Sequence, residues 1–185
     1  MPHIPLDEKL PGITGILNYR LDAALPIRQL TQILLRGEST LTEGERELIA
    51  TVVSHGNECK FCTAAHTAAA DLLLGDKETA AKAKYDPAHA PVSLKMKSLL
   101  NIARAVQING KNVTTLMVDE ARNAGTTDRE IYDTVMIAAL FSLYNRLVDG
   151  LASVTPSEPV FYEKLAGILK DKGYLPSENR YASLS

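Results

Sequence analysis

The chain contains few of the features that mark secreted, membrane or nucleic-acid-binding proteins. Only two of its 185 residues are cysteine, too few for the disulfide framework of a small secreted protein. No apolar run approaches the ~18 residues of a membrane span, and the first residues lack a signal-peptide pattern. The formal net charge of −2 offers no basic footprint for nucleic acid or an anionic membrane. These absences predict a soluble, cytoplasmic protein that binds neither nucleic acid nor membranes.

What is present is ordinary globular composition with a helical pattern. Hydrophobic residues make up 45% of the chain and charged residues 23%, which excludes a disordered chain. Apolar residues recur at helical spacing, and no stretch shows sustained strand-like alternation. We therefore predict one all-α domain over 1–185 with about eight or nine helices. It divides into an N-terminal arm with helices (1–40), a core (41–152) and a C-terminal helix (153–185).

Several helix boundaries are visible in the sequence. Residues 42–45 and 127–130 both read Thr-x-x-Glu, a capping box in which the hydroxyl and the carboxylate satisfy free backbone donors at a helix start. Pro26 fits the first turn of a helix that ends at Gly37. An alanine-rich helix is predicted over 58–74.

Both cysteines lie at the start of that alanine-rich helix. Cys59, Cys62 and His66 stand at offsets 0, +3 and +7, which places them on one helix face. The two cysteines are one turn apart and can form a disulfide in place. His66 is one turn beyond Cys62, within reach of its sulfur directly or through a water.

Thiol chemistry requires a thiolate, and two features of this segment favour one. Cys59 sits at the helix N-terminus, where the helix dipole stabilises negative charge. Cys62 has His66 as a base or a cationic partner. These features favour different cysteines as the nucleophile, so the spacing leaves both open.

Glu47 is a candidate partner for His66. On its own helix it lies opposite the large apolar residues, among small side chains, which indicates a helix packed on both sides. A carboxylate buried there needs a partner, and His66 on the next helix is the natural one. A carboxylate bound to an imidazole beside a thiol is the arrangement of nucleophilic catalysis.

The two cysteines have other interpretations besides thiol catalysis. The two cysteines could be inert core residues. A zinc site would need Glu47 or a second chain to supply the fourth ligand, because the chain has only one Cys-x-x-Cys. Haem attachment requires histidine where Thr63 stands, and a thioredoxin fold requires flanking strands.

Three neighbouring polar residues near the C-terminal end of the core were assigned a structural or oligomer role. Tyr144, Asn145 and Arg146 lie among apolar residues in the middle of a predicted helix. Arg146 could pair with Asp149 or with a carboxylate across an interface.

The phrase "ERELIATVVSHGNECKFCTAAH" resembles the signature of the alkylhydroperoxidase D (AhpD)-like proteins, within the carboxymuconolactone decarboxylase superfamily. It contains Glu47, Cys59, Cys62 and His66 at the spacing of that family, and the resemblance covers about residues 40–150. The arm "HIPLDEKLPGITGIL" and the chain length are similar to the longer subgroup called peroxidase-related proteins.

The resemblance implies an AhpD-like helical bundle, a homo-oligomer (dimer, trimer or hexamer) and thiol peroxidase or disulfide reductase chemistry. It implies that Cys62 attacks a small hydroperoxide and that Cys59 resolves the product as a Cys59–Cys62 disulfide, which an external dithiol reduces. Glu47 and His66 would form the proton relay. No other cofactor and no metal are implied.

One position departs from the family pattern. Well-known members carry histidine directly before the second cysteine, where this chain has Phe61, predicted to pack in the core. His55 could partly replace that histidine, although a histidine at a helix end is more often exposed. A lactone decarboxylase is disfavoured because that branch generally lacks the cysteine pair. The alternatives to an enzyme are a redox-responsive homo-oligomer and a zinc-binding module.

Overall fold

The computed structural model describes residues 1–177, which form nine α-helices, two short 3-10 helices and no β-strand. The predicted all-α class is confirmed for these residues; residues 178–185 of the predicted C-terminal part lie outside them. The elements in chain order are α1 (Ile13–Tyr19), α2 (Leu21–Arg36), α3 (Glu43–Gly56), α4 (Lys60–Leu74), α5 (Thr79–Tyr85), η1 (Pro87–His89), α6 (Leu94–Ile108), η2 (Gly110–Asn112), α7 (Thr115–Asn123), α8 (Asp128–Gly150) and α9 (Pro159–Lys172).

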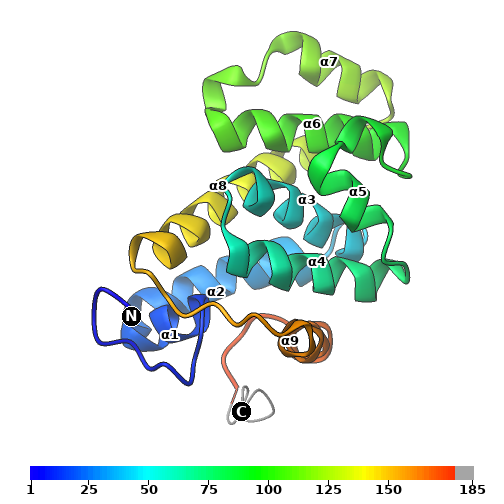
Figure 1. The fold of residues 1–185 in the computed structure, drawn as a ribbon. Helices are drawn as coiled ribbons and strands as arrows, with labels where there is room; N and C mark the ends of the chain where they lie inside the picture. Colours follow the sequence, from blue (N-terminus) through cyan, green and yellow to red (C-terminus); the bar gives the residue numbers. More distant parts are fainter. Residues whose placement is uncertain (178–185) are drawn as a thin grey trace.

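Helix α3 is the central element of the fold. It packs along α4, and α5, α6 and α8 also contact it (Figure 1). Ten of its fourteen residues are buried, including both the apolar stripe and the stripe of small residues. The prediction that this helix is packed on both sides is therefore confirmed. Any polar side chain in the middle of α3 must find its partners inside the protein.

The two predicted capping boxes are both present. Thr42 accepts from the Glu45 backbone N–H while the Glu45 carboxylate accepts from Thr42, and α3 begins there. The same exchange between Thr127 and Glu130 begins α8. Each box satisfies two backbone donors that a helix start leaves free.

The predicted start of the second helix was wrong. Pro26 lies inside α2, whose first residue is Leu21, rather than in its first turn. Residues 21–25 are mostly good helix formers, so the helix extends upstream of the proline. The missing proline N–H removes only one hydrogen bond of the helix.

The alanine-rich helix also starts later than predicted. Helix α4 begins at Lys60 with Cys59 as its N-cap, because Glu58 has a φ of +60° in the turn after α3. The Cys59 backbone N–H donates to the Ser54 carbonyl, 3.1 Å away, which ties this turn to the end of α3.

The N-terminal arm runs beside the segment that follows α8. The Gly12 N–H donates to the Val154 carbonyl at 2.8 Å, and the Ser153 hydroxyl donates to the Gly12 carbonyl at 2.9 Å. Gly12 has a φ of +61°, and a Cβ at this position would lie 2.2 Å from the Phe61 ring. A glycine is required because the backbone has a positive φ here and passes directly over the Phe61 ring.

The C-terminal helix α9 packs on α4, and the chain then turns back toward α2 (Figure 1). Gly173 makes this turn with φ +59° and ψ −139°, a region essentially restricted to glycine. The Gln32 side chain accepts from the Tyr174 backbone N–H at 2.7 Å. This bond brings Tyr174 to the end of α2.

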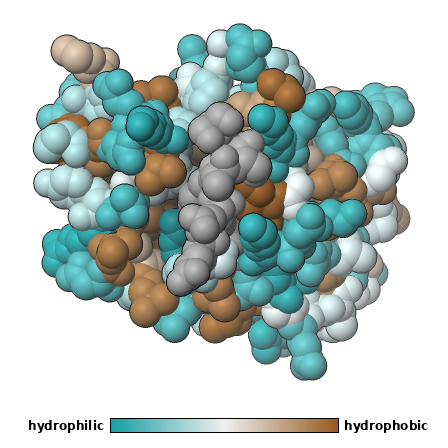
Figure 2. Space-filling model, turned by 90° about the horizontal axis from the view of Figure 1, so that it is seen from below, coloured by the Kyte–Doolittle hydropathy of each residue, from teal (hydrophilic) through white to brown (hydrophobic). Residues whose placement is uncertain are grey.

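The surface shows no continuous apolar face in the view from below. Figure 2 shows hydrophobic residues there as separate patches among hydrophilic ones. Among residues 1–177, no helix is long and apolar enough to span a bilayer.

Candidate functional site

The two cysteines occupy the junction between α3 and α4. Both thiols are free, and both are buried, with relative exposures of 0% for Cys59 and 2% for Cys62. Cys59 caps α4 and Cys62 lies in its first turn, so the two residues are one turn apart, as their spacing predicts.

The two thiols differ in acidity because they interact with each other. Hydrogen bonding from the side chain and then the backbone of Cys62 lowers the pKa of the Cys59 thiol, against the effect of burial. The contact with Cys59, together with burial, raises the pKa of the Cys62 thiol well above its usual value. In this reduced state, negative charge is therefore more stable on Cys59, at the helix N-terminus.

Helix α8 places two further polar groups near the thiols. A hydrogen bond from Asn145 lowers the pKa of the Cys62 thiol, opposing the larger effects that raise it. Asn145 is 1% exposed, and its amide donates to the Ser54 hydroxyl at 3.1 Å and accepts from Asn57 at 2.8 Å. Asp149, one turn further along α8, disfavours the thiolate of Cys59.

Glu47 and His66 form the predicted contact. Glu47 is fully buried in the middle of α3, and its Oε2 lies 2.6 Å from Nδ1 of His66 on α4. The His66 ring also packs edge-on against Phe141 of α8, with ring centroids 4.5 Å apart. With Nδ1 held by the carboxylate, Nε2 is the nitrogen left to exchange a proton.

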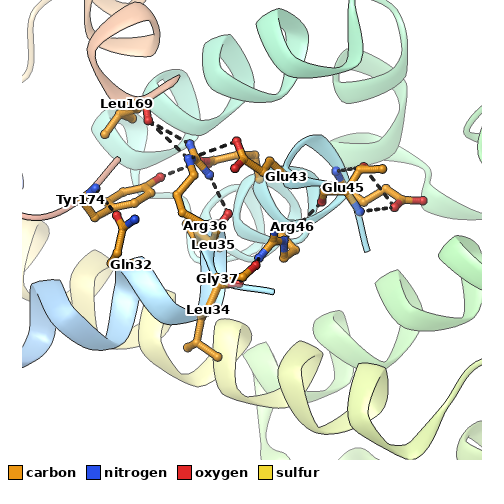
Figure 3. Close-up of polar contacts among 12 residues, drawn as sticks. Gln32, Leu34, Leu35, Arg36, Gly37, Glu43, Glu45, Arg46, Leu169 and Tyr174 are labelled. Carbon is orange, nitrogen blue, oxygen red and sulfur yellow. Dashed lines mark hydrogen bonds and ion pairs between the residues drawn. The ribbon is translucent and has the colours of Figure 1, made fainter. Parts of the chain in front are cut away.

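The other oxygen of Glu47 has two partners that the sequence analysis did not identify. Nη2 of Arg36, at the end of α2, lies 2.6 Å from Oε1, and the Tyr174 hydroxyl donates to the same oxygen at 2.6 Å. Figure 3 shows Arg36 extending between Tyr174 and Glu43, with Leu169 above it. Sequence spacing gave no signal for either contact, since Arg36 and Tyr174 are 11 and 127 residues from Glu47.

These partners keep Glu47 ionised. Burial opposes the charge, but the nearby His66 and Arg36 and the hydrogen bond from Tyr174 lower the pKa of Glu47 to about 2. Burial, and then the negative charge of Glu47, raises the pKa of Tyr174 well above its usual value, so its hydroxyl stays protonated. Glu47 is thus a permanent acceptor rather than a proton carrier.

Cys62 and His66 line one small cavity of about 50 Å³. Phe61, Tyr144 and Tyr174 also line it, and the remaining walls are mainly apolar side chains of α1, α4, α8 and α9. The space is sufficient for a water between the imidazole and the thiol. Cys59 is not part of its wall. A larger cleft of about 680 Å³ between α4 and α9 contains none of the four predicted site residues.

The remaining sequence predictions near the site had mixed outcomes. Phe61 is 1% exposed and packs against Phe161 and Tyr162, as expected for a core residue. His55 packs edge-on against Tyr85, with ring centroids 4.7 Å apart. Arg146 donates to the Ser142 carbonyl of its own helix, 3.0 Å away.

The part of the chain that the structure describes holds no group of three or more His, Cys, Asp or Glu side chains arranged to bind a metal ion. Glu47, which with a second chain was one of the two candidates for the fourth ligand of a zinc site, is bound to Arg36, Tyr174 and His66.

Comparison with known proteins agrees with this geometry. Residues 23–82 match the model of the carboxymuconolactone decarboxylase family, and this segment contains Glu47, both cysteines and His66. A search of curated proteins found no match.

Two solved structures share the fold. An uncharacterized peroxidase-related protein from Silicibacter sp. TM1040 is 26% identical, with a TM-score of 0.74 over 83% of this chain and 78% of its own. A second, from Ralstonia eutropha JMP134, is described as an alkylhydroperoxidase AhpD core; it is 24% identical, with a TM-score of 0.75 over 84% of this chain and 80% of its own.

The fold is therefore an AhpD-like helical bundle. The matched segment and the similar structures agree with the AhpD-like resemblance of the signature.

Proposed function

We propose that the protein is a thiol-dependent hydroperoxidase or disulfide reductase whose redox group is the Cys59–Cys62 dithiol. One observation carries the proposal: two free thiols lie one turn apart, and Cys62 shares a cavity with His66, which Glu47 holds through Nδ1. The names of the two similar structures support the same class of activity.

In the proposed cycle, His66 accepts the proton of Cys62 through a water in the cavity. The Cys62 thiolate attacks one oxygen of a hydroperoxide, the O–O bond breaks, and the alcohol leaves with the proton from His66. Cys62 is then a sulfenic acid, which condenses with the Cys59 thiol and releases water. An external dithiol reduces the resulting disulfide by exchange at Cys59 and is itself oxidised.

The more acidic thiol is not the thiol that lines the cavity, and this difference bears on the roles of the two cysteines. Cys59 is the more acidic thiol, whereas Cys62 lines the cavity that contains His66. We assign the attack to Cys62, because a peroxide must reach the sulfur and the imidazole together. Cys59 fits the resolving role: exchange at Cys59 gives a mixed disulfide, and its stabilised thiolate is the group that leaves when the second thiol of the external dithiol attacks.

The test compares Cys62→Ser with Cys59→Ser, using tert-butyl hydroperoxide as oxidant and dithiothreitol as reductant. We expect Cys62→Ser to abolish turnover. Cys59→Ser retains one stoichiometric oxidation, detected by mass spectrometry as a sulfenic acid trapped with dimedone. Full activity of Cys62→Ser, or the trapped sulfenic acid on Cys59 in that variant, would contradict the assignment.

A second candidate is a redox-responsive homo-oligomer that does not turn over. The near-complete burial of both sulfurs favours it, because buried thiols react slowly with solutes. Gel filtration of the oxidised and reduced protein beside the peroxide assay separates the two: a change of oligomer size without turnover supports the switch. Near-stoichiometric zinc, measured in protein purified without chelator, would instead support a metal-binding module.

A further inference from the structure

The buried charges around Glu47 determine whether His66 is able to accept a proton. A buried carboxylate without a counter-ion is strongly unfavourable, and it acquires a partner charge or a proton. In the part of the chain that the structure describes, His66 is the titratable group bound to Oε2. The contacts at Oε1 therefore decide whether the Glu47–His66 pair must bind an extra proton to neutralise itself.

Arg36 supplies a fixed positive charge at Oε1. Its side chain is only 4% exposed, and its guanidinium contacts Glu47 at 2.6 Å, Glu43 at 3.5 Å and the Leu169 carbonyl at 3.3 Å (Figure 3). Burial acts to lower its pKa, but Glu47, Tyr174 and Glu43 together outweigh that effect and the pKa of Arg36 is raised. Arginine stays charged at every pH at which the protein is folded.

Tyr174 supplies the second hydrogen bond and holds Arg36 in place. Its hydroxyl donates to Oε1 at 2.6 Å, and the Arg36 guanidinium lies over its ring, 5.1 Å from the centroid. The glycine-only turn at Gly173 and the bond from the Tyr174 N–H to Gln32 direct the ring toward α2. The segment after α9 therefore completes the site from a distant part of the chain.

Resting on the proposed function, we propose that Arg36 and Tyr174 are positioning residues that neutralise and fix Glu47, so that His66 remains able to accept the thiol proton. With Arg36 present, an ionised Glu47 and a neutral His66 form a group without net charge. Without Arg36, the same pair carries one buried negative charge and binds a proton instead. That proton occupies the nitrogen that the cycle requires.

Other charged and titratable groups face the pair from every packed element. They are Glu43 and Arg46 of α3, Arg28 and Arg36 of α2, Cys62 of α4, Tyr144 of α8, and Tyr174. Among residues 1–177, Arg36 alone combines a permanent charge with direct contact to Glu47.

The test measures proton uptake by the Glu47–His66 pair, through the imidazole carbon–proton signals of His66 in NMR spectra recorded against pH. His66→Gln identifies the signals. We expect Arg36→Met to move the midpoint upward by about one pH unit or more, because a buried counter-charge is lost. Arg36→Lys keeps the charge and is expected to return the midpoint close to that of the unsubstituted protein. If Arg36 had only a structural role, the charge of Arg36→Lys would not restore the midpoint.

Tyr174→Phe is the second variant, and it removes one hydroxyl while keeping the ring. We expect a smaller upward movement, about half a pH unit, because Glu47 loses a single hydrogen bond. Tyr162→Phe is the matched control, since it removes a buried hydroxyl that donates to the Pro156 carbonyl, away from Glu47. That control is expected to leave the midpoint unchanged.

An unchanged or lower midpoint in folded Arg36→Met would overturn the proposal. If Arg36→Met does not fold, an unchanged midpoint in Tyr174→Phe would overturn the proposal instead. The measurement needs no turnover, so it remains decisive for the positioning roles even if the protein shows no peroxidase activity. Absence of turnover in the unsubstituted protein would instead count against the proposed function.

Discussion

Two buried carboxylates, Glu47 and Glu130, have the same acidity but different surroundings. Each has a pKa lowered to about 2. Glu130 accepts from the Thr127 backbone N–H at 2.8 Å, from Lys95 at 2.6 Å and from Thr40 at 2.7 Å. Within residues 1–177, three side chains hold Glu47, and one of them is an imidazole.

The difference separates a carboxylate whose partners are a helix cap, a lysine and a threonine from one that is bound to an imidazole. The partners of Glu130 cap a helix and tie α8 to the loop before α3 and to α6. None of them exchanges protons near neutral pH. Glu47 is bound to a histidine, the side chain suited to proton transfer in that range. Low pKa alone therefore does not mark the functional group; the nature of the partner does.

The largest expected effect separates the two carboxylates by activity. We expect Glu47→Gln to reduce peroxidase turnover roughly 100-fold, because His66 loses the acceptor that orients it. Glu130→Gln is expected to leave turnover within about twofold, since no partner of Glu130 lines the cavity of Cys62. Steady-state assays on both variants check this. Equal losses in the two would remove the distinction.

The two carboxylates should also differ in how much each contributes to the free energy of unfolding. Glu47→Gln leaves Arg36 buried without its closest counter-charge, which we expect to lower the free energy of unfolding by about 3 kcal/mol. For Glu130→Gln we expect about 1–2 kcal/mol, because the Lys95 side chain is 27% exposed and reaches water. Urea unfolding at neutral pH measures both. A larger loss in Glu130→Gln would show that the capping network, rather than the site, dominates stability.

Lowering the pH should reduce the stability that each of the two carboxylates contributes. Their pKa values are near 2 in the folded protein and near 4.5 when unfolded, so the unfolded state binds protons first as the pH falls. The stability that they contribute is complete above about pH 4.5 and is lost between pH 4.5 and 2. Thermal midpoints recorded across this range should fall less steeply in either glutamine variant. A slope equal to that of the unsubstituted protein would contradict the low pKa of the residue replaced.

The smallest expected effect concerns the cap that Glu130 serves. Thr127→Ala removes one hydroxyl acceptor at the start of α8, and we expect a loss of about 1 kcal/mol with no change in turnover. Thr42→Ala is the matched variant at the start of α3, with the same local exchange. Thermal unfolding of both variants is the measurement. A loss of activity only in Thr42→Ala would indicate that the cap of α3 positions Glu47.

Local patterns predicted much of this molecule. Both capping boxes, the buried position of Glu47 and its contact with His66 follow from spacing along one or two helices. The helix starts at Leu21 and Lys60 were missed, because helix formers upstream of a proline and a single positive φ at Glu58 decide them.

The distant parts of the site were not predictable in this way. Asn145 was predicted to have a structural or oligomer role, and no local pattern indicated that its amide lowers the pKa of Cys62. Arg36 and Tyr174 had no sequence signal, because their contact with Glu47 depends on how α2 and the segment after α9 pack against α3. The turn at Gly173 directs Tyr174 toward α2, and no sequence feature near the cysteines indicates this turn.

The sequence by itself determined the helical class, the helix caps and the set Glu47, Cys59, Cys62 and His66, because helical spacing and capping chemistry act over a few residues. Only the tertiary structure decided that Arg36 and Tyr174 surround Glu47, that Cys59 is the more acidic thiol and that Cys62 shares a cavity with His66. Those properties depend on burial and on charges brought together from distant segments, and both arise only when the helices pack.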